Sequence, residues 1–148
     1  MPERPFAVLA FDFGLQRIGL ASGDTLTRTP SPRGAIGVTH RGPDWDLIAR
    51  AVNDAEPGLL VVGAPYNEDG SASEMTARAR AFAAELGHRF RLPVAQVDER
   101  YSSLEASTAL KSQRSRGLRR RHVRREDVDG TAAAVILQRW FSGEGNAG

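Results

Sequence analysis

The chain has 148 residues, of which 41% are hydrophobic and 26% charged, and its formal net charge is +2. This length and composition suffice for one compact domain with a hydrophobic core, and no apolar run approaches the roughly 20 residues of a membrane span. With no cysteine there are no disulfides, thiolate nucleophiles or Cys-based zinc sites, which favours an intracellular protein.

The first predicted element is a strand over residues 6–13, which are apolar except for Asp12 and lie between Pro5 and Gly14. Such a run is typical of a strand buried on both faces. Alternation places Asp12 on one face with Phe6, Val8 and Ala10, and Ala7, Leu9, Phe11 and Phe13 on the other. An ionised carboxylate among core side chains needs a partner or a metal. The simpler alternative is that Asp12 caps the following turn.

The rest of the first half predicts a hairpin, a third strand and a helix. We expect strands at residues 18–22 and 34–39, a loop at 24–33, and a helix from Asp44 to just before Pro57.

The second half alternates strands with helices. We expect strands at 59–63 and 93–97, and helices at 71–86, from 102 onwards, and at 127–140. The S-x-x-E pattern of Ser71 to Glu74, repeated at Ser102 to Glu105, predicts a capping box at two of these helices. The order of elements predicts a mixed α/β sheet covered by helices.

Three acids are placed to converge. In open α/β sheets, functional groups collect beyond the carboxyl ends of parallel strands, and Asp12 and Glu99 follow such strands. Asp129 opens the apolar face of the last helix, whose other members are Ala132, Ala133, Ile136, Leu137 and Trp140. The alternative for Asp129 is an acid at the start of a helix that is favoured only by the helix dipole. For Asp127 this is the default interpretation.

Converging carboxylates repel one another unless a cation lies between them. Magnesium favours oxygen ligands, and two such ions roughly 4 Å apart can activate a water and stabilise a leaving oxygen in phosphodiester cleavage. We therefore expect the three carboxylates to bind Mg²⁺ or Mn²⁺, with two ions in the site when substrate is bound.

The segment from Lys111 to Arg125 is strongly basic and contains no acid. Its basic residues are Lys111, Arg114, Arg116, Arg119, Arg120, Arg121, Arg124 and Arg125. The rest of the chain is net acidic, so the asymmetry indicates a local contact with a polyanion. The alternative is a solvated, disordered surface loop.

Four motifs carry a resemblance to a known family. They are Asp12–Gly14 with Arg17–Ala21, Val61–Pro65 with Asp69–Ser71, Asp98–Ser103, and Asp129–Ala133 with Ile136–Gln138. In this order, over nearly the whole chain, they closely resemble the YqgF family. The sequence departs from the family pattern at Gly130 and Gly23, where Ser is usual, and at Ala64, where Leu is common. Gly130 is expected to loosen the start of the last helix.

The resemblance implies a ribonuclease H-like fold, with a five-stranded mixed sheet of order 3-2-1-4-5 and strands 1–3 antiparallel. It also implies a cytoplasmic, metal-dependent endonuclease with the catalytic and metal-binding triad Asp12, Glu99 and Asp129. The substrate would be structured RNA, at the 5′ end of pre-16S ribosomal RNA, or branched DNA, at a Holliday junction.

Other functions fit less well. A non-catalytic RNA-binding assembly factor would leave three converging acids unexplained. ATP-binding relatives of the fold, the actin-like kinases and chaperones, need two such domains, for which this chain is too short. We expect a single nuclease domain over 1–148, with flexible tails at 1–5 and 143–148 and a mobile basic loop at 112–126. It would act as a monomer or weak homodimer, without membrane contact.

Roles are also expected for residues outside the triad. Nucleic-acid contacts are predicted for Lys111, Arg119, Arg120, Arg121, Arg124 and Arg125, and for Arg17 and Arg100. The last two flank the acids and either hold phosphate oxygens or neutralise nearby carboxylates. Asp98 is expected to support a turn or a water, Trp140 and Phe141 to pack in the core, and Asn67 and Asp69 to serve turn chemistry.

Overall fold

The computed structural model describes residues 4–67, 69–98 and 125–143, with side chains of the last segment described from Gly130 onwards. The elements are β1 Ala7–Asp12, β2 Arg17–Asp24, β3 Ser31–Thr39, β4 Gly42–Pro43, α1 Trp45–Ala55, β5 Pro57–Ala64, α2 Glu74–Phe90, β6 Val94–Asp98 and α4 Arg125–Ser142. The helix predicted from residue 102 lies outside the described part of the chain. Within the described part, no helix has the length and apolar character needed to cross a membrane.

The strands form one mixed sheet of order β4-β3-β2-β1-β5-β6. β1 pairs antiparallel with β2 and parallel with β5, β2 pairs antiparallel with β3, and β5 pairs parallel with β6. The expected order and directions are confirmed, but the expected number of five strands was wrong. The extra strand, β4, pairs with Val38 and Thr39 after a tight turn. It has only two residues, which is too short to leave a period-2 pattern in the sequence.

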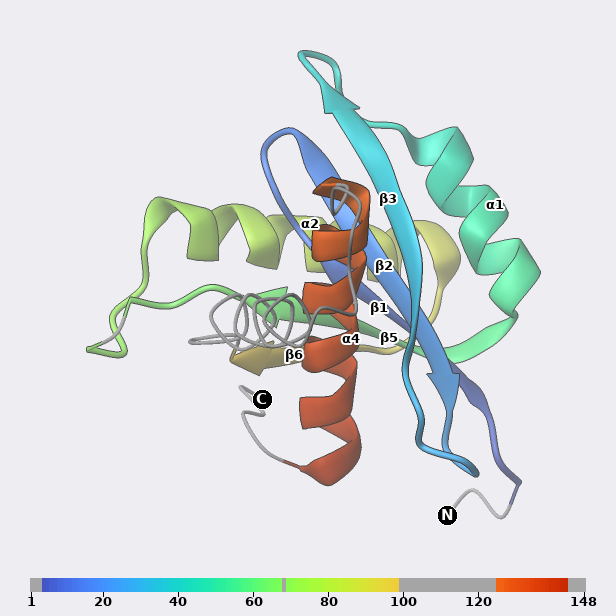
Figure 1. Cartoon of the computed structure of the whole chain (residues 1–148). Coiled ribbons are helices and arrows are strands. Elements are labelled where there is room, and N and C mark those ends of the chain that lie inside the picture. The colour runs from blue at the N-terminus through green and yellow to red at the C-terminus, as the bar shows by residue number, and fades with distance from the viewer. Residues whose placement is uncertain (1–3, 68, 99–124, 144–148) are drawn as a thin grey trace, which may run out of the picture.

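Helices cover both faces of the sheet, with α1 and α2 on one side and α4 on the other (Figure 1). Leu9 and Phe11 of β1 belong to the core beneath α1 and α2, whereas Val8 and Ala10 belong to the core beneath α4. The predicted alternation along β1 is therefore confirmed, and it sets the side on which each later residue of this strand lies.

Two glycines allow α4 to approach the sheet closely. A Cβ added at Gly130 would lie 3.2 Å from Cβ of Pro32 and 3.3 Å from the backbone nitrogen of Gly34, both in β3. A Cβ at Gly23 of β2 would lie 3.2 Å from the ring of Phe141. The two glycine departures from the family pattern thus stand where a larger residue would be crowded. Phe141 is buried in the core beneath α4, as predicted.

The predicted loop at 24–33 is shorter than expected, because β2 continues to Asp24 and β3 begins at Ser31. Asp24 makes the tight turn, accepting hydrogen bonds at Oδ1 from the backbone N–H of Thr27 (2.8 Å) and Leu26 (3.0 Å). These bonds, led by that from Thr27, lower the pKa of Asp24. Pro32 lies in β3 next to a register shift, a position where a strand tolerates proline.

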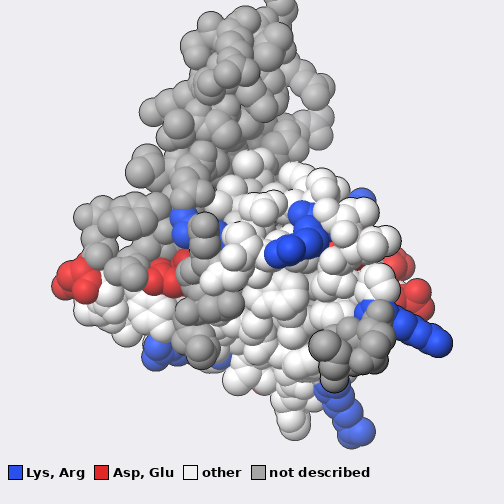
Figure 2. All heavy atoms as spheres, turned by 90° about the horizontal axis from the view of Figure 1, so that it is seen from below, with Lys and Arg blue, Asp and Glu red and all other residues white. Residues whose placement is uncertain are grey.

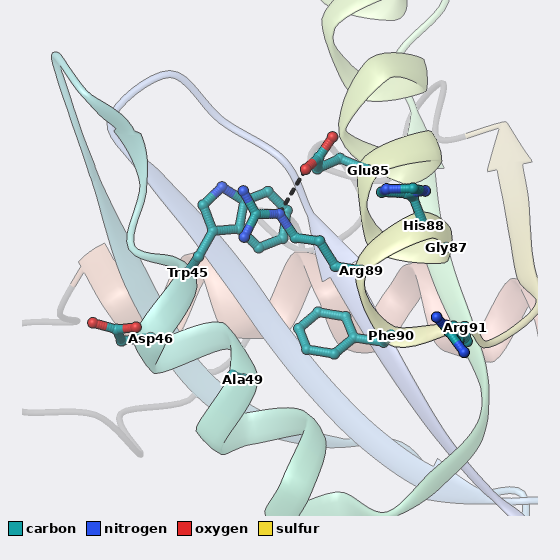
Figure 3. Close-up of a pocket in the computed structure, with 9 residues that line it drawn as sticks. All are labelled: Trp45, Asp46, Ala49, Glu85, Gly87, His88, Arg89, Phe90 and Arg91. Carbon is teal, nitrogen blue, oxygen red and sulfur yellow. Dashed lines mark hydrogen bonds and ion pairs between the residues drawn. The ribbon is translucent and has the colours of Figure 1, made fainter.

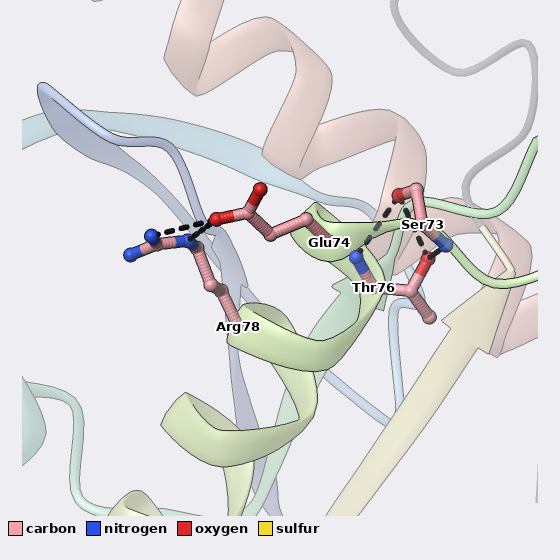
Figure 4. Close-up of polar contacts among 4 residues, drawn as sticks. All are labelled: Ser73, Glu74, Thr76 and Arg78. Carbon is pink, nitrogen blue, oxygen red and sulfur yellow. Dashed lines mark hydrogen bonds and ion pairs between the residues drawn. The ribbon is translucent and has the colours of Figure 1, made fainter.

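The start of α2 differs from its prediction (Figure 4). The capping box joins Ser73 and Thr76: the backbone N–H of Thr76 donates to Ser73 Oγ (3.2 Å), and that of Ser73 donates to Thr76 Oγ1 (2.8 Å). Ser71 is engaged instead by Asp69 (2.6 Å), and Glu74 forms an ion pair with Arg78 (2.8 Å). The S-x-x-E pattern therefore misplaced the cap by two residues.

Candidate active site

The candidate site lies at the edge where the parallel strands β1, β5 and β6 end. Phe11 pairs with Val62, and Ala64 pairs with Asp98, so the three strands finish near the same level of the sheet. Asp12 is the last residue of β1, is half-buried, and shares the α4 side with Val8 and Ala10 by strand alternation.

Two further acids stand at the end of β6. Asp98 is its last residue and is half-buried. Glu99 comes next in the chain, but it lies outside the described residues, so its place in the triad stays a prediction.

The start of α4 is brought to this same end of the sheet. Gly130 lies against the backbone of Gly34 in β3. Gly34 precedes the residue that pairs with Gly19, and Gly19 pairs with Asp12. The α4 backbone next to Asp129 therefore lies two strands away from Asp12, level with the end of β1. The direction of the Asp129 side chain is outside the described part.

Among the described residues, no group of three His, Cys, Asp or Glu side chains comes together. Of the predicted triad, only the Asp12 side chain is described, and the proposed set joins it to Glu99 and Asp129. All three donors are carboxylates, and a set of hard oxygen donors fits Mg²⁺ or Mn²⁺ and not a soft metal.

The predicted cationic contacts are described only in part. Arg100, Lys111, Arg119, Arg120, Arg121 and Arg124 lie outside the described residues, and of Arg125 only its place at the start of α4 is described. Arg17 opens β2, is half-buried and is engaged in polar or electrostatic contacts. On the face in Figure 2, the described basic side chains lie apart from one another around largely uncharged surface. On that face, the described residues thus form no basic patch of their own.

The turn after Asp12 is held from several sides. The ring of Phe13 packs 5.0 Å from that of Phe82 in α2, and the carbonyl of Gln16 accepts a hydrogen bond from the N–H of Val38 (2.9 Å). A Cβ added at Gly14 would lie 2.6 Å from the carbonyl oxygen of Arg17, so the turn closes too tightly for any side chain there. These contacts fix the position of Asp12 at the strand end.

Replacing Gly14 with alanine is therefore expected to shift the turn and lower cleavage activity by roughly tenfold to 100-fold, because small displacements of catalytic groups are costly. Gly37→Ala is the control, since the same substitution in the neighbouring strand β3 adds a Cβ that meets nothing within 4 Å. Steady-state cleavage rates of both variants check this. Equal rates for the two would show that the turn does not position the site.

The loop after β5 borders the same edge. Asn67 Nδ2 donates to Ser71 Oγ (2.9 Å), and the N–H of Ser71 donates to Asp69 Oδ1 (2.9 Å), so the predicted turn chemistry is confirmed. A contact beside this loop was not predicted from the sequence: Arg80 of α2 donates a hydrogen bond to the hydroxyl of Tyr66. No spacing rule links residues 14 positions apart in different elements, so only the fold reveals this pair.

Solved structures define the class of fold. RuvC of Thermus thermophilus, in complex with a Holliday junction substrate, matches with a TM-score of 0.54 and 13% identity, covering 93% of this chain and 94% of that chain. The yeast mitochondrial Holliday junction resolvase Ydc2 matches with a TM-score of 0.51 and 10% identity, covering 90% and 77%. At such low identity the likeness concerns the fold alone, which is ribonuclease H-like, as expected.

Sequence comparison then identifies the family. The model described as "RuvX: Holliday junction resolvase" matches residues 6–143, and the chain belongs to this family. Relatives that carry the name "Putative pre-16S rRNA nuclease" come from Alcanivorax borkumensis, Burkholderia mallei and Coxiella burnetii. They are 43%, 41% and 38% identical, covering 93%, 95% and 99% of this chain and 96%, 91% and 99% of theirs. The predicted resemblance and the nuclease class are confirmed.

Proposed function

We propose that the chain is a divalent-metal-dependent endonuclease that processes the 5′ end of pre-16S ribosomal RNA. The observation that carries this proposal is the position of Asp12, which ends a buried central strand at the level to which the start of α4 is brought. The names of the relatives support ribosomal RNA as the substrate class.

Asp12, Glu99 and Asp129 would hold the metal. When bound, a divalent ion activates water for attack on the phosphodiester and stabilises the leaving oxygen. The chain's own contribution is to hold the carboxylates in place, through the turn at Gly14 and through the close approach of α4 to β3. The Arg-rich segment would position the backbone by phosphate contacts, which carry little sequence information. We propose that the whole chain works as one domain in the cytoplasm.

A second candidate is the resolution of Holliday junctions, favoured by the description of the family and by the RuvC-like fold. Cutting two strands symmetrically requires a two-fold symmetric dimer. A monomer or weak homodimer fits processing of a single RNA strand more directly.

The test is to offer precursor ribosomal RNA and a four-way DNA junction side by side, with Mg²⁺, with Mn²⁺ and with excess chelator. We expect metal-dependent cleavage of the RNA, faster than that of the junction, and loss of activity in chelator without unfolding. Faster junction cleavage would favour the second candidate. Cleavage that persists in chelator would exclude the metal mechanism, and metal-dependent binding without cleavage would indicate an assembly factor.

A further prediction concerns the basic segment. If it contacts phosphates, binding releases counterions and log affinity falls linearly with log salt, by roughly 0.7 to 0.9 per phosphate. With about half of its cations engaged, the slope would be about −3. Replacing Arg119, Arg120 and Arg121 with alanine should make this slope shallower and weaken binding equally across sequences. Salt titrations of wild type and triple variant on the same RNA measure this, and equal slopes would leave the segment as solvated surface.

A further inference from the structure

We propose that Tyr66 and Arg80 form a nucleic-acid contact site on the α2 side of the catalytic edge, where Tyr66 stacks on an unpaired base and Arg80 meets a phosphate. This inference rests on the proposed function, because it takes the nuclease substrate as the ligand. It adds that the substrate has an unpaired nucleotide near the cut.

The first observation is position. Tyr66 follows the end of β5 by two residues, in the loop toward which the arrows of β5 and β6 point in Figure 1. Val62 pairs with Phe11, so Gly63 is level with Asp12, and Tyr66 follows Gly63 by three residues, which is at most about 10 Å of chain at 3.3 Å per residue. That distance spans about three nucleotides of a duplex strand at 3.4 Å each. A substrate cut at Asp12 would reach Tyr66.

The second observation is that the ring is held in place before any ligand binds. The backbone of Tyr66 forms a bridge with Ala72, and the preceding carbonyl, of Pro65, accepts hydrogen bonds from the hydroxyls of Thr76 and Ser73. The hydrogen bond from Arg80 fixes the hydroxyl end of the ring. Tyr66 as a whole is only half-buried. A fixed, partly exposed aromatic ring loses little entropy on binding.

The third observation is charge. Of the three arginines of α2, Arg78 is paired with Glu74 (2.8 Å) and Arg89 with Glu85 (2.6 Å). Among the described residues, Arg80 has no acidic partner: its contacts are with the uncharged phenol of Tyr66, with its guanidinium carbon 5.3 Å from the ring centre. A guanidinium has five N–H donors and suits phosphate oxygens. Among the residues that the structure describes, Arg80 is thus the arginine of α2 that brings a positive charge without a paired carboxylate to the edge of the site.

The other end of α2 provides a natural control. There Arg89 stacks over Trp45, with its guanidinium carbon 4.0 Å from the ring centre, at a cleft of about 840 Å³ (Figure 3). This second arginine–aromatic pair lies at the end of α2 far from the loop after β5, and its charge is matched by Glu85. We assign it to packing between α1 and α2.

The experiment measures binding apart from cleavage, by fluorescence anisotropy in chelator. The probe is a single-stranded RNA from the 5′ precursor region, and a fully paired duplex of the same sequence serves for comparison. Tyr66→Leu is expected to weaken single-strand binding by roughly fivefold to 100-fold, the range for stacking of one base, and to leave duplex binding nearly unchanged. Arg80→Gln should weaken binding to both and make the salt dependence shallower, whereas Arg89→Gln should not.

A series of RNAs with one abasic position each tests the stacked base without depending on any variant. Wild type is expected to lose affinity at one position, and Tyr66→Leu to lose nothing further there. The proposal is overturned if no single position matters to wild type, if Tyr66→Leu binds single strands like wild type, or if it weakens duplex binding equally. Failure of the nuclease proposal would appear as absent cleavage, which leaves these binding comparisons intact.

Discussion

Asp12→Asn is expected to abolish cleavage while the protein remains folded, because the change removes a carboxylate charge from the proposed metal site. Metal stabilisation of the transition state is worth several kcal/mol, so the rate should fall by at least about 100-fold. Glu99→Gln and Asp129→Asn should act similarly. Losing one of several like charges relieves repulsion, so thermal stability without metal should hold or rise.

Cleavage assays and melting curves of the three variants check this prediction. Asp54→Asn is the matched control, an exposed acid on α1 away from the catalytic edge, and it should cleave like wild type. Activity within a few-fold of wild type in any triad variant would remove that residue from the site.

Phe82→Ala is expected to cause the largest loss of stability. Phe82 is only 4% exposed, and its ring lies 5.6 Å from those of Phe11 and Trp45 and 5.0 Å from that of Phe13. It joins α2 to β1, to the start of α1 and to the turn after Asp12. Truncating a buried phenylalanine costs about 3–5 kcal/mol, and here it also removes the support of Phe13.

Denaturant unfolding measures the change in free energy. Leu26→Ala, at a side chain 72% exposed in the turn after β2, should change it by less than about 0.5 kcal/mol. A loss below about 1 kcal/mol for Phe82→Ala would show that the aromatic cluster does not hold the two helices to the sheet.

The buried faces of strands and helices were predictable from the sequence, because burial of one face makes apolar residues recur at a fixed spacing along each element. The alternation of β1 placed Asp12 on one face with Val8 and Ala10, and the structure shows this face to be the α4 side. The apolar face of the last helix, from Ala132 to Leu137, is buried as expected. Element ends were less predictable. Pro32 within β3 and the cap at Ser73 depend on tertiary hydrogen bonds and register, which local patterns do not contain.

The site was predictable where it follows strand ends and family motifs, as for Asp12. The reason for a glycine at position 130 was not predictable. Gly130 lets α4 approach β3 closely, and this contact joins residues about 100 positions apart in the chain. The same holds for Tyr66 and Arg80, which meet only because α2 folds back beside the loop after β5.

The most direct test of a metal at the carboxylate edge is cleavage of an RNA with a single sulfur at a non-bridging oxygen of the mapped scissile phosphate. Magnesium favours oxygen ligands, so cleavage of one stereoisomer should fall strongly in Mg²⁺ and recover in Mn²⁺, which accepts sulfur more readily. Cleavage of both stereoisomers at the unmodified rate in Mg²⁺ would contradict a metal-held scissile phosphate.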